Sequence, residues 1–111
     1  KSLYGLINKK GEVALPVRYQ QITQLPTKRF IVETNSLKGL ADVDGRLVVV
    51  PKYNSITDLN NGYVIVERND QYGLLTLHGV STVPMMYDYI VYDPFNARYM
   101  ALKKAAWEKV L

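Results

Sequence analysis

The segment Tyr4–Ile22, which reads YGLINKKGEVALPVRYQQI, contains a pattern that returns twice along the chain. Residues 38–56 read KGLADVDGRLVVVPKYNSI, and residues 72–90 read YGLLTLHGVSTVPMMYDYI. Two glycines, a tyrosine and an isoleucine recur in one register at steps of 34 residues: Gly5, Gly39 and Gly73; Gly11, Gly45 and Gly79; Tyr19, Tyr53 and Tyr87; Ile22, Ile56 and Ile90. Such a fixed step is the sequence signature of a repeat architecture. We therefore divide the single domain 1–111 into copies at about 3–36, 37–70 and 71–105, with a partial fourth copy at 106–111.

Each copy opens with a predicted tight turn. Asn8, Asp42 or Thr76 stands three residues before the second landmark glycine. The side-chain oxygen of Asn, Asp or Thr can accept a hydrogen bond from the backbone that follows, which favours entry into a turn. The glycine adopts a left-handed backbone conformation without steric cost. This pattern predicts a type I turn closed by a glycine bulge, a common hairpin connection.

The rest of each copy predicts short antiparallel strands. A proline (Pro16, Pro51 or Pro84) ends the strand that returns from the turn, as expected of a residue that cannot donate to a strand ladder. A strand with Tyr-x-x-Ile follows, then a second turn at PTKR, NNG or DPFNA, and then a last strand. Each copy thus reads as two hairpins with about four short strands. The predicted fold class is all-β, a meander of tandem hairpin repeats.

The repeat pattern alone does not decide whether the array closes on itself, or whether its C-terminal end is a helix or a strand. Stacked copies bury faces that one copy cannot bury alone, and an open stack, a part of a propeller-like array and a closed threefold barrel all satisfy that need. We expect an open or partly closed stack, because the chain ends inside a fourth copy. Residues 99–111 contain good helix formers, so a short capping helix is one interpretation. The repeat register favours strands there, with Trp107 in the place of Tyr72.

Composition and charge exclude several classes of protein. The chain has 111 residues, of which 48% are hydrophobic and 22% charged, as in an ordinary globular domain. It has no cysteine, which excludes disulfides and cysteine metal sites. No apolar run is long enough to span a membrane as a helix. The net charge of +4 is spread along the chain, whereas a nucleic-acid-binding face needs a dense basic stripe, so nucleic acid is an unlikely partner.

Residues suited to catalysis or metal binding are few. His78 is the only histidine and falls in a predicted turn. The stretch DVDG, residues 42–45, lacks the ordered oxygen ligands of a calcium loop and fits a turn instead. No paired carboxylates, nucleophile motif or phosphate loop is present. We therefore predict no catalytic residue, no metal and no cofactor, and a protein that is not an enzyme.

The ordered landmarks resemble the WG repeat, a bacterial tandem module. Its unit runs aromatic-Gly-hydrophobic-Ile-Asp/Asn-x-x-Gly, then an Ile-Pro step, then Tyr. The matching residues begin at Tyr4-Gly5, Lys38-Gly39 and Tyr72-Gly73, and no copy has an intact Trp-Gly pair. The resemblance implies a binding or scaffold module, transfers no catalytic residue, and weakly favours the bacterial envelope or a secreted location.

The third copy contains the one candidate binding surface. Tyr89, Tyr92, Phe95 and Arg98 lie close together in the sequence YDYIVYDPFNARY. At the 34-residue step, polar residues replace Tyr89 and Phe95 in the other copies. Exposed aromatic side chains beside a charge suit contact with a protein or a sugar. The interpretation that competes with both is that these aromatic residues form a terminal core or a stacking face for a neighbouring copy. We expect a protein partner, and a carbohydrate-binding module is the alternative.

Overall fold

The structure is a computed structural model that describes residues 2–111. Over these residues it contains strands and no helix, and every strand pair is antiparallel. The strands are β1 (Tyr4–Ile7), β2 (Val13–Tyr19), β3 (Gln21–Gln24), β4 (Phe30–Thr34), β5 (Leu37–Ala41), β6 (Leu47–Tyr53), β7 (Ser55–Asp58), β8 (Tyr63–Arg68), β9 (Gln71–Thr76), β10 (Ser81–Tyr87), β11 (Tyr89–Asp93), β12 (Arg98–Lys103) and β13 (Ala106–Lys109).

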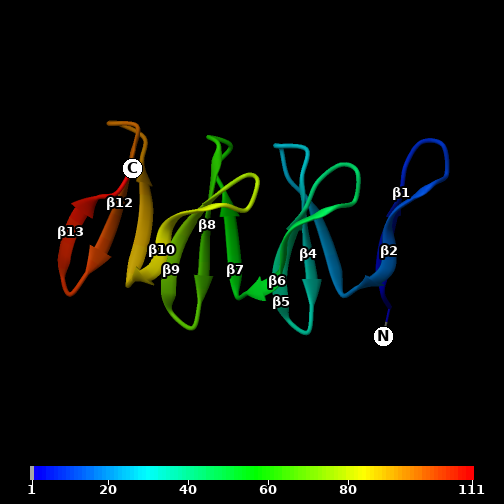
Figure 1. Ribbon diagram of the computed structural model, residues 1–111, viewed down its shortest axis with the longest axis horizontal. Coiled ribbons are helices and arrows are strands. Elements are labelled where there is room, and N and C mark those ends of the chain that lie inside the picture. Colours follow the sequence, from blue (N-terminus) through cyan, green and yellow to red (C-terminus); the bar gives the residue numbers. More distant parts are fainter. Residues whose placement is uncertain (1) are drawn as a thin grey trace.

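These strands form four small sheets that follow one another along the long axis of the molecule (Figure 1). Sheet 1 is β1-β2, sheet 2 is β3-β4-β5-β6, sheet 3 is β7-β8-β9-β10 and sheet 4 is β11-β12-β13. The molecule measures 49 × 26 × 19 Å. The predicted all-β stack of antiparallel hairpins is therefore confirmed, and the stack is open and not a closed barrel.

The sheets are offset by half a unit from the copies in the sequence. Sheet 2, for example, joins the last two strands of the first copy to the first two strands of the second. Within each of sheets 2, 3 and 4, a two-residue turn links the last strand of one copy to the first strand of the next. Both residues of each turn have positive φ: Asn35-Ser36, Asn69-Asp70 and Lys104-Ala105. Positive φ at both positions is the geometry of a type I′ hairpin. These three hairpins were not predicted from the sequence.

The predicted glycine turns are confirmed in all three copies. In the second copy Gly45 N–H donates to the carbonyl of Asp42 at 3.1 Å, and Gly45 has φ of 82°. The Asp42 carboxylate accepts hydrogen bonds from the backbone N–H groups of Asp44 (2.9 Å) and Arg46 (3.0 Å). Asn8 and Thr76 make the same pair of side-chain bonds in their own turns. The turn is thus stabilised by its own first residue, as the residue type predicts.

The first landmark glycine lies where two strands cross closely. A Cβ on Gly39 would collide with the carbonyl oxygen of Val49 and would lie 2.7 Å from the nitrogen of Pro51. The β5–β6 pairing is irregular at this point, since its register shifts between Lys38 and Leu40. The prediction that the proline ends its strand is wrong, because Pro16, Pro51 and Pro84 lie inside β2, β6 and β10. The strand instead bulges over the glycine at this point, and only a residue without a side chain fits beneath it.

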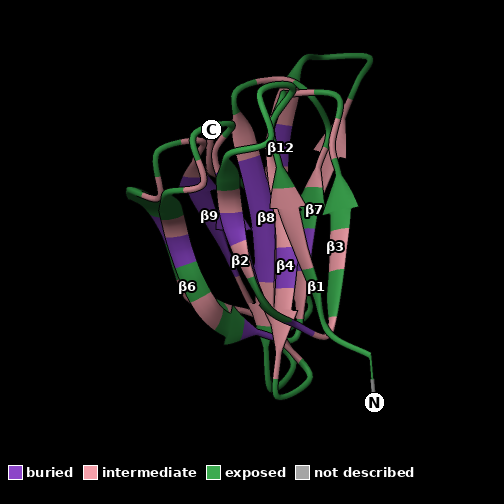
Figure 2. Ribbon diagram, turned by 90° about the vertical axis from the view of Figure 1, so that its right-hand side faces the viewer, coloured by how far each residue is buried: buried purple, intermediate pink, exposed green. Residues whose placement is uncertain are grey.

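Each junction between neighbouring sheets has its own hydrophobic core. The middle core, between sheets 2 and 3, contains the fully buried Leu40, Val64 and Val66. Smaller clusters fill the junctions on either side, around Leu15 and Val32 and around Leu74 and Ala101. Burial is concentrated along the central strands of the stack and exposure at the edges (Figure 2). Short strands thus obtain a buried face from the next sheet, which is the reason a single copy does not suffice.

One residue connects each sheet to the next, and it also clamps the following hairpin. Asn54 N–H donates to the carbonyl of Glu67 at 2.8 Å, and the Asn54 side chain accepts from Asn69 N–H at 2.9 Å. Gln20 and Asp88 occupy the equivalent places and make equivalent bonds. The lower edge of the stack in Figure 1 is therefore tied together by a repeated hydrogen-bond pattern.

The C-terminal segment is a strand hairpin, so the alternative of a capping helix is wrong. β13 pairs with β12, and Trp107 lies opposite Leu102 just as Tyr72 lies opposite Glu67 in sheet 3. Beyond β13, the backbone of residues 110 and 111 still bonds to Tyr99. The helix-forming composition of this segment is overridden because β12 offers an unpaired edge that the segment completes.

Candidate functional site

The segment that connects β11 to β12 contains one residue more, between equivalent paired positions, than its two counterparts. Five residues separate the paired Gln24 and Phe30 in sheet 2, and five separate Asp58 and Val64 in sheet 3. In sheet 4, six residues (93–98) separate the equivalent pair Tyr92 and Tyr99. The extra residue explains the 35-residue step from Tyr72 to Trp107. The repeat period is thus broken in the turn that carries the candidate residue Phe95.

Asp93 holds this turn in one conformation. Its carboxylate accepts hydrogen bonds from the backbone N–H of Phe95 (3.0 Å) and from the side-chain amide of Asn96 (2.8 Å), and it forms an ion pair with Arg98 at 3.1 Å. The hydrogen bond from Asn96 has the largest effect on the pKa of Asp93 and lowers it. Burial opposes this effect, and the weaker hydrogen bonds from Arg98 and the backbone add to it, so that the pKa lies below its ordinary value. Arg98 therefore contributes to the shape of the turn.

Phe95 projects from the tip of this stabilised turn. Its side chain is 93% exposed, more than any other large hydrophobic residue among those described. A large exposed aromatic ring on an ordered turn loses little conformational freedom when it binds, and such residues dominate the energy of many interfaces. Phe95 is thus an almost fully solvent-facing aromatic side chain on an ordered turn.

Tyr92 lies at the base of the turn, within a group of tyrosines. Its ring packs on Tyr99 with centroids 5.0 Å apart, and Tyr63 packs on the other side of Tyr99 at 5.9 Å. The hydroxyl of Tyr99 donates to the side-chain oxygen of Asn61. Burial raises the pKa of Tyr99 above its ordinary value. These contacts support the turn from below and connect it to the β7–β8 turn of sheet 3.

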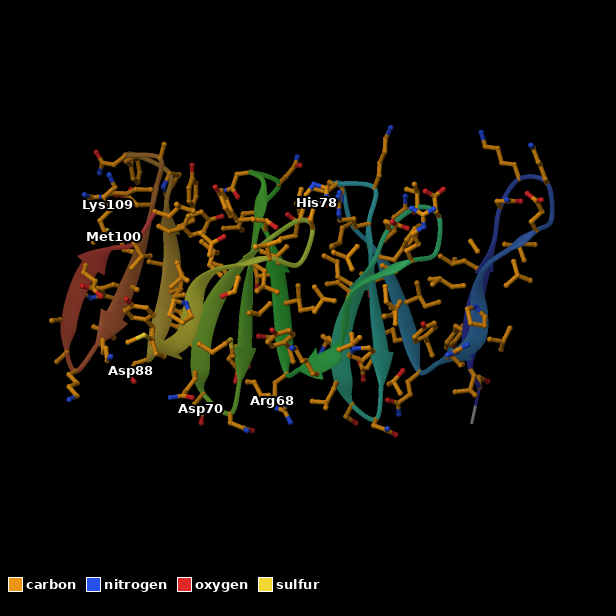
Figure 3. The ribbon with its side chains drawn as sticks, viewed as in Figure 1. Arg68, Asp70, His78, Asp88, Met100 and Lys109 are labelled. Atoms are coloured by element: carbon orange, nitrogen blue, oxygen red, sulfur yellow. The ribbon has the colours of Figure 1, made fainter. Side chains whose placement is uncertain are left out.

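Tyr89 lies at the opposite end of β11, away from Phe95. Its ring, 44% exposed, packs edge-on against Tyr72 with centroids 5.0 Å apart. Tyr89 and Trp107, which is 49% exposed, both lie opposite Leu102, so the three side chains share one face of sheet 4. Met100 is on this face too, and Figure 3 shows it with Lys109 at the end of the stack.

The four predicted site residues therefore form two groups and not one surface. Tyr92, Phe95 and Arg98 gather at the β11–β12 turn, whereas Tyr89 packs on Tyr72 at the other end of β11 and shares the end face of sheet 4 with Trp107. Trp107 was not among the predicted site residues, although the repeat register already placed it in a strand, at the position equivalent to Tyr72. Whether these residues bind a partner stays a prediction.

The remaining candidates from the sequence have local roles. His78 is exposed at the tip of the β9–β10 turn (Figure 3), and its backbone N–H donates to Thr76. Across residues 2–111, no group of three or more His, Asp or Glu side chains is arranged to hold a metal ion. The same residues contain no helix long and apolar enough to cross a membrane.

Comparison with known protein families gives one match. The family model described as "WG containing repeat" matches residues 4–35 and 39–72, more than half of the chain. The two ranges correspond to the first and second copies, and the third copy repeats their turn geometry in the structure. No curated protein and no solved structure matches the chain.

Proposed function

This chain belongs to the WG-repeat family, and on that basis we propose that it is a non-enzymatic binding module that holds a protein partner through the β11–β12 turn. The observation that carries this proposal is Phe95, a nearly fully exposed aromatic residue on the one turn that breaks the repeat period. The other turns at the same edge carry mostly polar and charged tips, so the stack acts as a scaffold that presents one anchor.

The proposed contact is a pocket on the partner that receives the Phe95 ring. Aromatic anchors of this kind account for about 2 kcal/mol or more of binding energy each, which is about 30-fold in the dissociation constant. Asp93 keeps the turn ordered before binding, which reduces the entropy lost on association. The polar rim of Asn96 and Arg98 surrounds the anchor, as at many protein interfaces.

A photoreactive phenylalanine analogue at position 95 tests the proposal. In cells of the source organism we expect one discrete crosslinked protein, which excess unmodified chain competes away and the Phe95→Ser chain does not. Leu59, which is also exposed and lies in the equivalent turn of sheet 3, is the matched control position. With the identified protein purified, Phe95→Ser should weaken binding by about 30-fold and Leu59→Ser by less than about threefold.

Light scattering separates a foreign partner from self-association. A mass that rises with protein concentration and falls to the monomer value in Phe95→Ser would make the partner a second copy of the chain. A strict monomer with no crosslinked product from position 95 would contradict the proposal.

A carbohydrate is the second candidate ligand, and it is favoured by the other aromatic group. Tyr89 and Trp107 flank Leu102 on one face of sheet 4 and are each about half exposed. Aromatic rings arranged in this way could stack on sugar rings. A glycan that protects Tyr89 and Trp107 from chemical modification, and whose binding is lost in Trp107→Ala but kept in Phe95→Ser, would replace the protein-binding proposal.

A further inference from the structure

A hollow of about 280 Å³ opens at the lower edge of the stack, where sheets 2 and 3 meet. Its walls are the end of β6, the end of β8 and the first residue of β9. The residues that line it are Lys52, Tyr53, Arg68, Asn69, Gln71 and Met85. The hollow is far from Phe95, which lies at the upper edge, and its lining includes two cations and no acidic residue.

The two cations in the hollow have no carboxylate partner. Within residues 2–111 the ion pairs are Lys38 with Glu33 and Arg98 with Asp93, so neither Lys52 nor Arg68 takes part in one. The acidic residues nearest to Arg68 in the sequence are Glu67 and Asp70, and neither forms an ion pair in the described part of the chain. The Glu67 carboxylate accepts hydrogen bonds from Ser55 and from the backbone of Asp70.

Both cations are attached to rigid parts of the fold. Lys52 lies over the ring of Tyr53, with its nitrogen 5.5 Å from the ring centroid, and Tyr53 is part of the buried core. Arg68 is followed by Asn69, whose backbone is clamped by the Asn54 side chain at 2.9 Å. The ends of β6 and β8 are therefore anchored by the core and by the hairpin clamp, and the two cations line the same hollow without an ion-pair partner among the described residues.

The neighbouring junction contains the same hollow with one cation fewer. Between sheets 1 and 2 a hollow of about 250 Å³ is lined by Arg18, Tyr19, Asn35 and Pro51, the residues one repeat before Lys52, Tyr53, Asn69 and Met85. Thr34 stands there in place of Arg68. The repeat thus supplies the cavity at both junctions, and the second cation is particular to the junction of sheets 2 and 3.

We propose that the hollow formed by Lys52 and Arg68 is a binding site for an oxyanion, either a carboxylate or a phosphate group. The planar guanidinium of Arg68 can donate two parallel hydrogen bonds to such a group, and the Lys52 ammonium supplies a second charge. The side-chain amides of Asn69 and Gln71 add neutral donors at the rim. This site is independent of the Phe95 surface and of the function proposed for it.

A titration followed by amide NMR tests the site. At low ionic strength, sodium phosphate or sodium acetate should shift the amide resonances of residues 52–54 and 68–71 in a saturable way, with a dissociation constant of about 1–10 mM, because the site is open to water. Saturation by phosphate alone assigns the site to phosphate groups, and saturation by acetate alone assigns it to carboxylates.

Two double variants distinguish a specific anion site from nonspecific attraction of anions to a positively charged chain. Lys52→Ala with Arg68→Ala should weaken binding by more than about tenfold, and both side chains are exposed, so the fold is retained. Lys9→Ala with Lys10→Ala removes the same charge from a distant turn and should change the dissociation constant by less than about twofold. Thr34→Arg should create a second saturable site at residues 18–20 and 34–37.

Two results would overturn the inference. One is shifts that spread over the whole chain and do not saturate with either anion. The other is an equal loss of binding in the Lys9/Lys10 and Lys52/Arg68 double variants. A failure here leaves the crosslinking result at position 95 untouched, since the two surfaces lie on opposite edges.

Discussion

Two turns of the molecule have the same local structure and different surroundings. Asn8–Gly11 and Asp42–Gly45 share their side-chain and backbone hydrogen bonds, and their glycines have φ of 83° and 82°. Gly45 lies against the backbone of Ala14 in the preceding sheet, so that an added Cβ would collide with the Ala14 carbonyl oxygen. Apart from the two neighbours of Gly11 in the chain, no atom of the described residues lies within 4 Å of the same position on Gly11. The glycine therefore serves the turn in both places, and it serves the packing between sheets only at Gly45.

The largest expected effect comes from a pair of alanine substitutions at these glycines. Gly11→Ala should lower the free energy of unfolding by about 1 kcal/mol, because alanine resists the left-handed conformation. Gly45→Ala adds a collision with the next sheet and should cost about 4 kcal/mol or more. Urea unfolding of both variants gives the two values. Equal losses would show that the contact between sheets adds nothing, and the comparison would fail.

A second comparison concerns the two-residue hairpins at the lower edge. Asn69-Asp70 and Lys104-Ala105 both have positive φ, although only the first contains residues that tolerate it well. Replacing Lys104-Ala105 with Asn-Gly should raise the free energy of unfolding by about 1 kcal/mol, whereas Asp70→Gly should change it by less than about 0.5 kcal/mol. The midpoint of thermal unfolding measures the difference. A larger gain in stability from Asp70→Gly than from Asn-Gly at residues 104 and 105 would contradict the expectation that Lys104-Ala105 is the more strained turn.

The smallest expected effect concerns the β11–β12 turn and its dependence on pH. The pKa of Asp93 is lower in the folded chain than in the unfolded chain, where it is about 3.9. The carboxylate therefore stabilises the fold above about pH 4, and this contribution is lost as the pH falls through the lowered folded pKa. Asp93→Asn should be less stable than wild type at neutral pH, and the gap should shrink as the pH falls below about 4.

The measurement for Asp93 is the urea midpoint of both proteins at several pH values. Asp58→Asn, in the equivalent turn of sheet 3, is the control, because that turn lacks the arginine and the extra residue. A gap between wild type and Asp93→Asn that stays constant with pH would contradict the assigned role of the carboxylate.

Much of the fold could be predicted because its signals are local. Turn geometry depends on the residue that starts the turn and on the glycine that ends it, and both recur in three copies. The hairpins at Asn35-Ser36, Asn69-Asp70 and Lys104-Ala105 were missed since their residues vary and only one turn of the three contains two typical residues. The helix alternative at residues 99–111 was wrong because local propensity is weaker than the demand of an unpaired strand edge.

The candidate site was harder to predict because it depends on which ends of strands meet. The sequence places Tyr89 six residues from Phe95, and only the strand direction shows that they lie at opposite ends of β11. Trp107 lies on the same face of sheet 4 as Tyr89 because β13 pairs with β12. The repeat register indicates this pairing, whereas the helix-forming composition of residues 99–111 favours a helix. The hollow of Lys52 and Arg68 gathers residues from two sheets, so no spacing in the sequence reveals it.

By itself, the sequence determined the strand content and the glycine turns, because these depend on residues within a few positions of one another, and it determined the repeat, because the same local pattern recurs at a fixed step of 34 residues. The tertiary structure decided that the stack is open, that each sheet draws on two copies, and which charges and rings stand together. These features depend on packing between sheets and on strand ends that meet across a junction. Such contacts join residues that lie far apart in the chain, and one repeat contains no information about its neighbour's orientation.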